Sequence, residues 1–301
     1  MTTPLLTGQV VRSNGHNLEG WSNVDGGLRI DVSRLKSIEL DEVAGTASGG
    51  TGLLQKEVVA ALGEHGCTIP TGSEGGVVLA GEFGLLTRRM GLGCDHLLVA
   101  DIVVADGTDS VWYGGTRADI TAALAPLLAT GSPDVTITEG AWPAVYTDVD
   151  KAADDVAKWK FLSQFVKRPF PDEAIDLICR YMANSPAPAS NYFLSSFGGA
   201  VRNEPPGGSA FPHRDALFYC EPGAGWNGPE LTSKALGWVA DFGRALQPYA
   251  DGAYVNVPNA GAADWEAQHY GANADRLRRV KASYDPHNVF TFEHSIPGRT
   301  S

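Results

Sequence analysis

The spacing of apolar residues in the first third of the chain predicts a few regular elements. Apolar positions in Leu53–Leu62 recur at helical spacing and Gly66 follows them, so we expect a helix that ends there. Residues 26–32 (GGLRIDV) predict a short strand, and the end of SRLKSIELD predicts a second one. His96–Ala105 is an almost continuous apolar run, which is typical of a strand covered on both faces.

The second half of the chain has a different pattern, in which helical periods alternate with short strands. Alternating apolar and polar positions indicate a sheet with one face on helices and the other on a cavity. We therefore expect an α+β fold in two lobes, with a boundary near Asp106–Gly115. The expected helices are Lys151–Phe165, Pro171–Met182 and Leu231–Gln247, and the expected strands are Asn191–Phe197, Ala216–Cys220 and Ala253–Val257.

Composition and charge exclude some classes of partner. The formal net charge of the 301 residues is −12, whereas nucleic acids and anionic membranes require a basic surface. The four cysteines lie far apart without a CxxC pair, so we expect free thiols and no metal site. The beginning of the chain shows no signal-peptide pattern, and no run has the length of a membrane span. A cytoplasmic protein with a small-molecule partner is expected, and a homodimer stays open.

Three ordered stretches of the sequence carry a family resemblance. Val10–Asp41 contains RSNGHN, GWS and GGLRIDVSRL, and Gly84–Gly107 reads GLLTRRMGLGCDHLLVADIVVADG. The third stretch is the C-terminal part, with Ser209–Tyr219 (SAFPHRDALFY), Gly252–Val257 (GAYVNV) and His269–Phe290. Together they resemble the berberine-bridge-enzyme-like FAD-linked oxidases of the vanillyl-alcohol-oxidase superfamily, whose FAD-binding lobe is of the PCMH type.

The resemblance implies a cofactor site and a division into lobes. In such relatives the histidine at the position of His16 forms a covalent bond to the flavin. Neighbouring glycines let backbone N–H groups approach the diphosphate. Residues 1–110, completed by 270–301, would form a reduced FAD-binding-type lobe, and 111–269 would form the substrate lobe. The implied cofactor-binding residues are His16, Arg12, Asn14, Gly15 and Asn288.

Several features of the sequence depart from the family pattern. Only eleven residues precede Arg12, where relatives have a βαβ subdomain, and Asn14 replaces a glycine. The attachment cysteine is missing near Ser73, and a GGG run has become Ala80-Gly81-Glu82. A GGGGNFG strand–turn–strand insertion is also absent. A carboxylate beside a diphosphate is unfavourable, because two unit charges about 4 Å apart repel by about 4 kcal/mol at an effective dielectric constant of about 20.

These departures lead to a specific expectation about cofactor and activity. Val257 replaces the tyrosine that serves as general base in some relatives. We therefore expect a biosynthetic enzyme without a cofactor, which performs non-redox ring formation, cycloaddition or rearrangement of a bulky natural-product intermediate by holding it in a reactive conformation. The alternative is an FAD-dependent oxidoreductase for oxidative cyclisation or dehydrogenation with O₂, with the flavin on His16. A second alternative is a non-catalytic protein that binds a pathway intermediate.

Candidate catalytic residues lie on the strands expected in the second half. Tyr254, Asn256, Tyr192 and Tyr219 carry phenol and amide groups that can orient a polar substrate or donate to a developing oxyanion, while tyrosine is also common in strands for packing alone.

Other motifs favour a structural interpretation. His213-Arg214-Asp215 is expected to be structural, with Arg214 paired to a carboxylate. Tyr284–Asn288 (YDPHN) predicts a turn in which Asp285 and Asn288 bond the backbone. Gly26-Gly27 lacks the GxGxxG spacing and predicts a hairpin turn.

Overall fold

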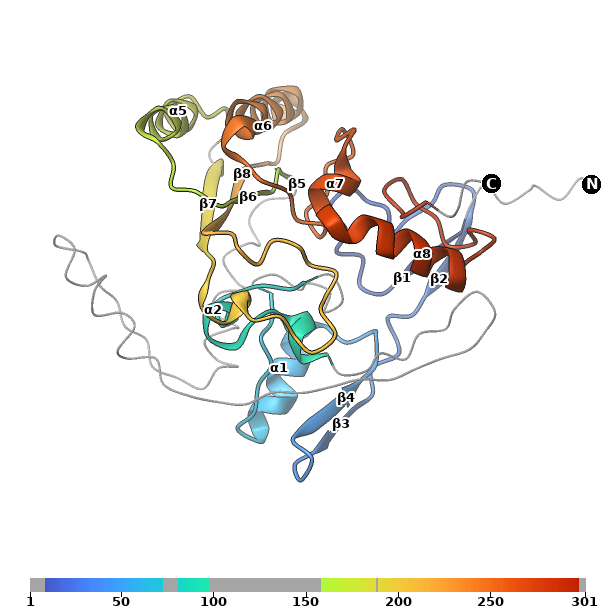
Figure 1. Cartoon of the computed structure of the whole chain (residues 1–301). Helices are drawn as coiled ribbons and strands as arrows, with labels where there is room; N and C mark the ends of the chain where they lie inside the picture. Colours follow the sequence, from blue (N-terminus) through green and yellow to red (C-terminus); the bar gives the residue numbers. More distant parts are fainter. Residues whose placement is uncertain (1–8, 73–80, 98–157, 188, 298–301) are drawn as a thin grey trace, which may run out of the picture.

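The computed structural model describes residues 9–72, 81–97, 158–187 and 189–297. The boundary expected at Asp106–Gly115 and most of the apolar run His96–Ala105 lie outside the described residues. Figure 1 shows the arrangement of the described helices and strands, which confirm the α+β class.

The second half is organised around strand β8 (Phe218–Trp226). Strands β5 (Lys158–Phe161) and β6 (Gln164–Val166) pair antiparallel with β8 in one continuous register, so they follow one another along the same edge. Strand β7 (Asn191–Ser196) pairs antiparallel with Phe218–Gly223 and therefore takes the other edge of β8. The result is a small antiparallel sheet with its longest strand in the middle.

A proline explains why β5 and β6 are separate strands. Leu162 donates its N–H to the carbonyl of Pro222, 3.1 Å away, but Pro222 has no N–H to return the bond. The helix expected over Lys151–Phe165 is therefore wrong in its described part: pairing with β8 decides the local structure, and the alternation of Trp159 and Phe161 fits a strand.

Helices cover one face of this sheet, as the alternation in the sequence predicts. Helix α5 (Asp172–Ala183) and helix α6 (Thr232–Leu246) lie together above the strands in Figure 1. The Phe242 ring of α6 stacks on Tyr192 of β7, with 5.3 Å between ring centroids. The expected helices at Pro171–Met182 and Leu231–Gln247 are confirmed to within a residue at each end.

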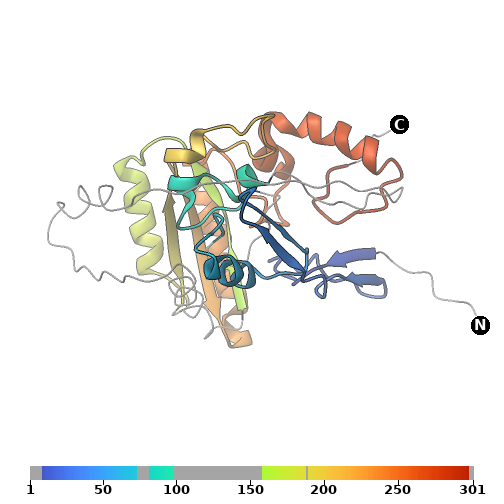
Figure 2. The same ribbon diagram turned by 90° about the horizontal axis from the view of Figure 1, so that it is seen from below.

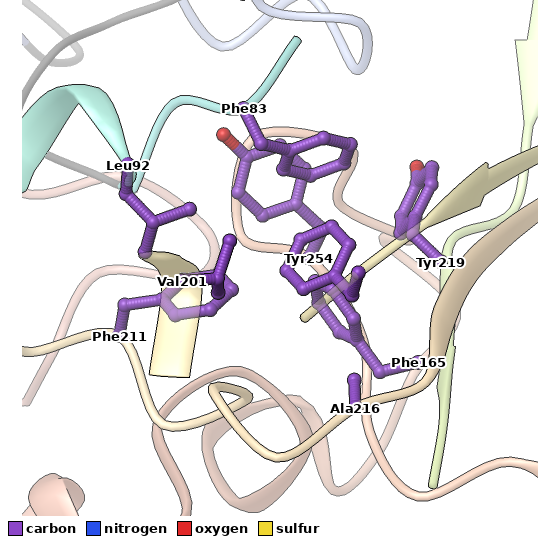
Figure 3. Packing of buried hydrophobic residues seen from close by; sticks show 9 residues of the cluster. Phe83, Leu92, Phe165, Val201, Phe211, Ala216, Tyr219 and Tyr254 are labelled. Atoms are coloured by element: carbon purple, nitrogen blue, oxygen red, sulfur yellow. The ribbon is translucent and has the colours of Figure 1, made fainter. Parts of the chain in front are cut away.

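The opposite face of the sheet carries the main hydrophobic core. Phe165 is fully buried and contacts five further aromatic rings of this core, which come from distant parts of the sequence. Figure 3 shows how the rings of Phe83, Phe165, Phe211, Tyr219 and Tyr254 lie in this core. We call this group the aromatic core; it consists of Phe83, Phe165, Phe197, Phe211, Tyr219 and Tyr254, with Leu92, Val201 and Ala216 packed among them.

The N-terminal part forms two small sheets and a helix. Strands β1 (Gln9–Arg12) and β2 (Leu28–Asp31) are parallel, and β3 (Ile38–Asp41) and β4 (Thr46–Gly49) are antiparallel. Helix α1 (Gln55–Glu64) follows, as its apolar spacing predicts. The hairpin turn expected at Gly26-Gly27 is wrong, because the strand after it pairs in parallel with β1 and not with an adjacent antiparallel strand.

The C-terminal helices return to the N-terminal strands. Helix α7 (Trp265–Tyr270) and helix α8 (Ala274–Tyr284) lie at the same end of the molecule as β1 and β2, away from α5 (Figure 2). The Trp21 ring contacts both Phe292 and His294, with centroid distances of 5.4 and 4.8 Å. The first and last parts of the chain thus pack together.

Two of the expected strands need correction. The strand expected at Ala216–Cys220 begins at Phe218 and continues to Trp226. Ala253–Val257 is a turn and not a strand: Val257 donates its N–H to the Tyr254 carbonyl, and the buried Ser163 hydroxyl accepts the Tyr254 N–H at 2.9 Å. The Tyr254 N–H therefore bonds the Ser163 side chain and not the backbone carbonyl of an adjacent strand.

The remaining elements are short. No helix within the described ranges is long and apolar enough to cross a membrane. The short elements are helix α2 (Thr87–Met90) and the 3₁₀ turns Gly93–His96, Gly199–Arg202, Pro229–Leu231, Gln247–Tyr249 and Gly271–Asn273.

Replacing Phe165 by alanine should lower the free energy of unfolding by about 3–5 kcal/mol, because it leaves a cavity in the aromatic core. Phe290→Ala is the matched control: this ring is 40% exposed, and its loss should cost less than about 1 kcal/mol. Equilibrium urea unfolding followed by circular dichroism measures both. Equal losses of unfolding free energy in the two variants would contradict the conclusion that Phe165 is a main contributor to the stability of the aromatic core.

Candidate functional site

The segment Arg12–His16 forms a loop held to the residues before α1. Ser13 Oγ donates to the Thr51 carbonyl at 2.6 Å, and Asn14 Nδ2 donates to the Gly52 carbonyl at 3.1 Å. These two bonds hold the loop against the turn that leads into the helix. Asn14, which replaces a family glycine, thus stabilises the loop through its side chain.

The backbone of this loop presents unused hydrogen-bond donors. Gly15 has a φ of +78°, and a Cβ there would lie 2.7 Å from Arg12 Nη2, so this position requires glycine. The N–H groups of Asn14, Gly15 and His16 have no acceptor in the described part of the chain. The His16 side chain is exposed. Successive free N–H groups around a left-handed residue form an anion-binding nest.

A second group of polar atoms lies at the edge of the aromatic core. The Tyr254 hydroxyl oxygen accepts the backbone N–H of Glu82 at 2.9 Å and Asn256 Nδ2 at 2.8 Å. The structure therefore brings Tyr254 and Asn256 together, although they lie in a turn. Figure 3 shows the hydroxyl groups of Tyr254 and Tyr219 on separate sides of the core.

The Glu82 carboxyl group is buried in the same place. It accepts the Gly72 N–H at 3.2 Å, while its second oxygen has no partner among the described residues. Burial raises the pKa of Glu82 to about 7, and the bond from Gly72 offsets only part of that effect. A large share of the molecules therefore holds Glu82 uncharged at neutral pH.

Tyr219 and Glu221 form a hydrogen-bonded pair on the face of the sheet opposite α5 and α6, the face that also carries the aromatic core. The Tyr219 hydroxyl donates to the Glu221 carboxylate. Burial, together with the Glu221 charge, holds the pKa of Tyr219 well above its usual range. The phenol stays protonated and orients the carboxylate.

Aromatic rings extend this face towards β5. Trp159 and Phe161 stack in parallel, with centroids 5.2 Å apart. A Cβ at Gly225 would lie 2.8 Å from the Trp159 ring and one at Gly223 would lie 2.7 Å from the Phe161 ring, so the two glycines let the rings lie flat on β8. Phe193 of β7 is on the same face and is 42% exposed. We call Trp159, Phe161, Phe193 and the Tyr219–Glu221 pair the open face.

Tyr192 lies apart from the other three candidate catalytic residues. It precedes Phe193 in β7, so its side chain points to the opposite face, where it stacks on Phe242 beneath α6. Burial raises the pKa of this phenol beyond the usual range of tyrosine, and Cys220 lies beside it. The candidate residues are thus divided between the two faces of the sheet.

The segments with an expected structural role have one. Arg214 is buried and donates to Asp95, with 3.0 Å between Nη1 and Oδ2, and it also pairs with Glu204. Asp285 accepts the N–H groups of Val289 and Phe290 at 2.7 and 3.0 Å. Asn288 has a φ of +50°, which suits the turn after α8, but its side chain is exposed and makes no bond to the backbone of the described residues, contrary to the expectation.

Sequence reasoning missed Glu221 as part of the site. The signal was present, since residues two apart in a strand share a face and Tyr219 was already a candidate. The four cysteines are free thiols. Among the described residues no group of three or more histidine, cysteine or acidic side chains could hold a metal ion.

Two family profiles match this chain. The profile described as "FAD binding domain" matches residues 8–109, and the one described as "Berberine and berberine like" matches residues 253–297. The first contains the Arg12–His16 loop, and the second contains Tyr254 and Asn256. The Arg12–His16 loop and the Tyr254–Asn256 pair therefore lie in regions that match a family profile, whereas Tyr219 and Glu221 lie outside both.

Relatives and solved structures agree with these profiles. The chain is 26% identical to "Uncharacterized FAD-linked oxidoreductase YgaK" of Bacillus subtilis, over 95% of this chain and 85% of that protein. The 383 aligned positions exceed the 301 residues of the chain, so YgaK carries segments that are missing here. Wild-type BBE-like 1 of Physcomitrella patens superposes with a TM-score of 0.84 at 21% identity, covering 98% of this chain and 87% of that one. Berberine bridge enzyme from Eschscholzia californica gives 0.81 at 18% identity, covering 98% and 86%.

The expectation that the protein has no cofactor is wrong, and with it the cofactor-free cyclase loses its basis. The FAD-binding profile and the FAD-linked relatives point to FAD. The electrostatic argument is also weakened in detail, because Glu82 is buried, burial raises its pKa to about 7, and its side chain bonds the Gly72 backbone. Sequence profiles, relatives and fold agree that this chain belongs to the berberine-bridge-enzyme-like family of FAD-linked oxidoreductases.

Proposed function

We propose that this protein is an FAD-dependent oxidoreductase that carries its flavin on His16 and dehydrogenates a ring-bearing alcohol. The observation that carries the proposal is the Arg12–His16 loop, in which an exposed imidazole follows consecutive backbone N–H groups that have no acceptor among the described residues. Those groups suit an anionic diphosphate, and the imidazole is accessible for covalent attachment. Bound FAD supplies a two-electron acceptor for hydride.

The residues around Glu82 are compatible with a diphosphate nearby. An ionised carboxylate would repel the cofactor, but the uncharged carboxyl group favoured by burial does not. The Glu82 carboxyl group accepts the Gly72 N–H, and the Tyr254 hydroxyl accepts the Glu82 N–H, so both the side chain and the backbone of Glu82 are held in place. Tyr254 and Asn256 thus act as positioning residues for the Glu82 segment in this proposal.

The Tyr219–Glu221 pair supplies the proton acceptor. Oxidation of an alcohol removes a hydride from carbon and a proton from the hydroxyl group, and a carboxylate in reach of that hydroxyl accepts the proton. Tyr219 holds the Glu221 carboxylate in place by donating to it. The pair lies on the open face beside Phe193, whose ring is partly exposed.

The open face also indicates the shape of the substrate. The parallel rings of Trp159 and Phe161 lie flat on β8 beside the carboxylate. Aromatic rings bind the flat faces of other rings and the apolar faces of sugars through dispersion. A bulky natural-product intermediate with a hydroxyl group on a ring meets these requirements.

The attachment of the flavin to His16 can be tested by acid precipitation. Wild-type protein is expected to be yellow after loading with FAD, and the flavin should stay with the precipitated protein. His16→Ala should release the flavin into the supernatant, whereas His65→Ala, a second exposed histidine paired with Glu42, should behave like wild type. Colourless protein that takes up no FAD would refute the proposed function.

Removing the charge of Glu221 should slow catalysis. Glu221→Gln keeps the size of the side chain but cannot accept a proton, so the rate constant of flavin reduction should fall by about 10²- to 10⁴-fold. The measurement is the anaerobic bleaching of the bound flavin by a panel of benzylic and sugar alcohols. Glu173→Gln, an exposed residue in the first turn of α5, is the control. Full activity of Glu221→Gln with the flavin still bound would exclude this carboxylate as the base.

The protonation of Glu82 makes stability depend on pH in a defined direction. Its folded-state pKa of about 7 exceeds the usual glutamate value of 4.5, so its ionisation costs stability increasingly between pH 4.5 and 7, by roughly 3 kcal/mol. Glu82→Gln removes this cost and should become more stable relative to wild type as the pH rises from 5 to 8.

In wild type and in Glu82→Gln alike, two buried histidines make the stability depend on pH in the opposite direction to Glu82. Burial lowers the pKa of His213 and of His269 to about 4, so their contribution is present above pH 6.5 and is lost as the pH falls towards 4. Because both proteins contain these histidines, the difference between the two urea-unfolding series isolates Glu82. A difference that stays constant from pH 5 to 8 would mean that Glu82 is ionised in the folded state.

A further inference from the structure

A cavity of about 210 Å³ lies on the side of the aromatic core that faces the C-terminal helices. Its walls are mainly apolar and include Phe211, Val255, Leu277 of α8 and the ring of Tyr254. Two further wall residues, His213 and His269, carry nitrogen atoms, and each is only 4% exposed. The cavity is large enough for a small aromatic molecule, since an apolar cavity of about 150 Å³ is known to hold benzene.

The cavity is separate from the open face. The Phe165 ring stacks on His213 with 4.2 Å between centroids, and it contacts Tyr219 at 5.3 Å. Phe165 therefore lies between His213 of the cavity wall and Tyr219 of the Tyr219–Glu221 pair. The Tyr254 hydroxyl is engaged by Glu82 and Asn256, while its ring contributes to the cavity.

The hydrogen bonds of His213 define what the cavity offers to a ligand. The ring bonds the backbone of Ala253 and Gln268, and Nε2 is buried without a partner in the described part of the chain. A Cβ at Gly252 would lie 2.8 Å from Nδ1, so the Nδ1 side of the ring is packed against the backbone. Nδ1 is thus the donor to a carbonyl oxygen, and Nε2 presents a lone pair.

His269, the second histidine of the cavity wall, also favours an uncharged ligand. His269 Nδ1 is also buried and has no partner among the described residues. Burial favours the neutral form of both rings, so no positive charge is present to bind an anion. A buried acceptor without a bond is costly, and a hydroxyl group that donates to it recovers this cost. An apolar body fits the remaining walls.

We propose that this cavity is a second binding site, for an uncharged aromatic alcohol of about the size of phenol, whose hydroxyl group donates to His213 Nε2. The site does not require flavin, so it goes beyond the proposed oxidoreductase activity. A ligand here would contact the Tyr254 ring, whose hydroxyl group holds the Glu82 backbone. Occupancy is thereby linked to the segment beside the candidate cofactor site.

The experiment compares phenol with toluene, which has nearly the same shape and no hydroxyl donor. Isothermal titration of the purified full chain should show saturable binding of one phenol, at least tenfold tighter than toluene. His213→Phe should reduce the affinity for phenol to that for toluene, because the acceptor is lost while the apolar wall remains. Leu277→Trp should weaken the binding of both compounds by filling the cavity from a half-buried wall position.

A measurement on the wild-type protein covers the case in which His213→Phe does not fold. In ¹⁵N-histidine-labelled protein, the Nε2 resonance of a neutral buried histidine should move on addition of phenol and stay in place with toluene. Absence of saturable phenol binding, which would mean that the cavity holds water only, overturns the proposal. Equal affinities for phenol and toluene overturn the assignment of the hydroxyl group to His213.

Discussion

The packing of aromatic rings against the inner face of β8 is the interaction on which the rest of the structure depends. Phe83 comes from the N-terminal half, Phe165 from β6, Phe211 from the loop before β8 and Tyr254 from the turn after α6. No two of these segments are neighbours in sequence, so the core that they share fixes where each segment lies. The candidate site residues are attached to that core, and their positions follow from it.

Burial in this core also determines the charges near the site. Glu82 is 1% exposed, and burial raises the pKa of its carboxyl group to about 7, because a buried charge is costly. Arg214 stays charged in the interior because Asp95 and Glu204 lie beside it. Burial therefore favours the uncharged form of Glu82 but leaves Arg214 charged, because among the described residues only Arg214 has groups of opposite charge beside it.

The cofactor illustrates how a residue substitution can mislead when its surroundings are unknown. Asn14 and Glu82 replace family glycines, and both substitutions suggested a damaged flavin site. In the structure, Asn14 anchors the loop that presents the free N–H groups, and Glu82 turns its carboxyl group into the interior. A loss of glycine is tolerated where the new side chain finds a hydrogen bond and where its charge is suppressed.

The sequence by itself determined the α+β class, helices α1, α5 and α6 and strands β2, β3 and β7, because these follow from the local periodicity of apolar residues. It also determined the family, the Asp285 turn and the ion pair of Arg214, because these follow from motifs with fixed spacing. Only the tertiary structure decided that 158–166 forms strands, that 253–257 is a turn and that Tyr192 faces the helices while Tyr219 faces the core. It also showed that Glu82 is buried and that Glu221 pairs with Tyr219. Local patterns could not give these results, because backbone hydrogen bonds to β8 and the loss of water around buried groups depend on residues far away in the chain.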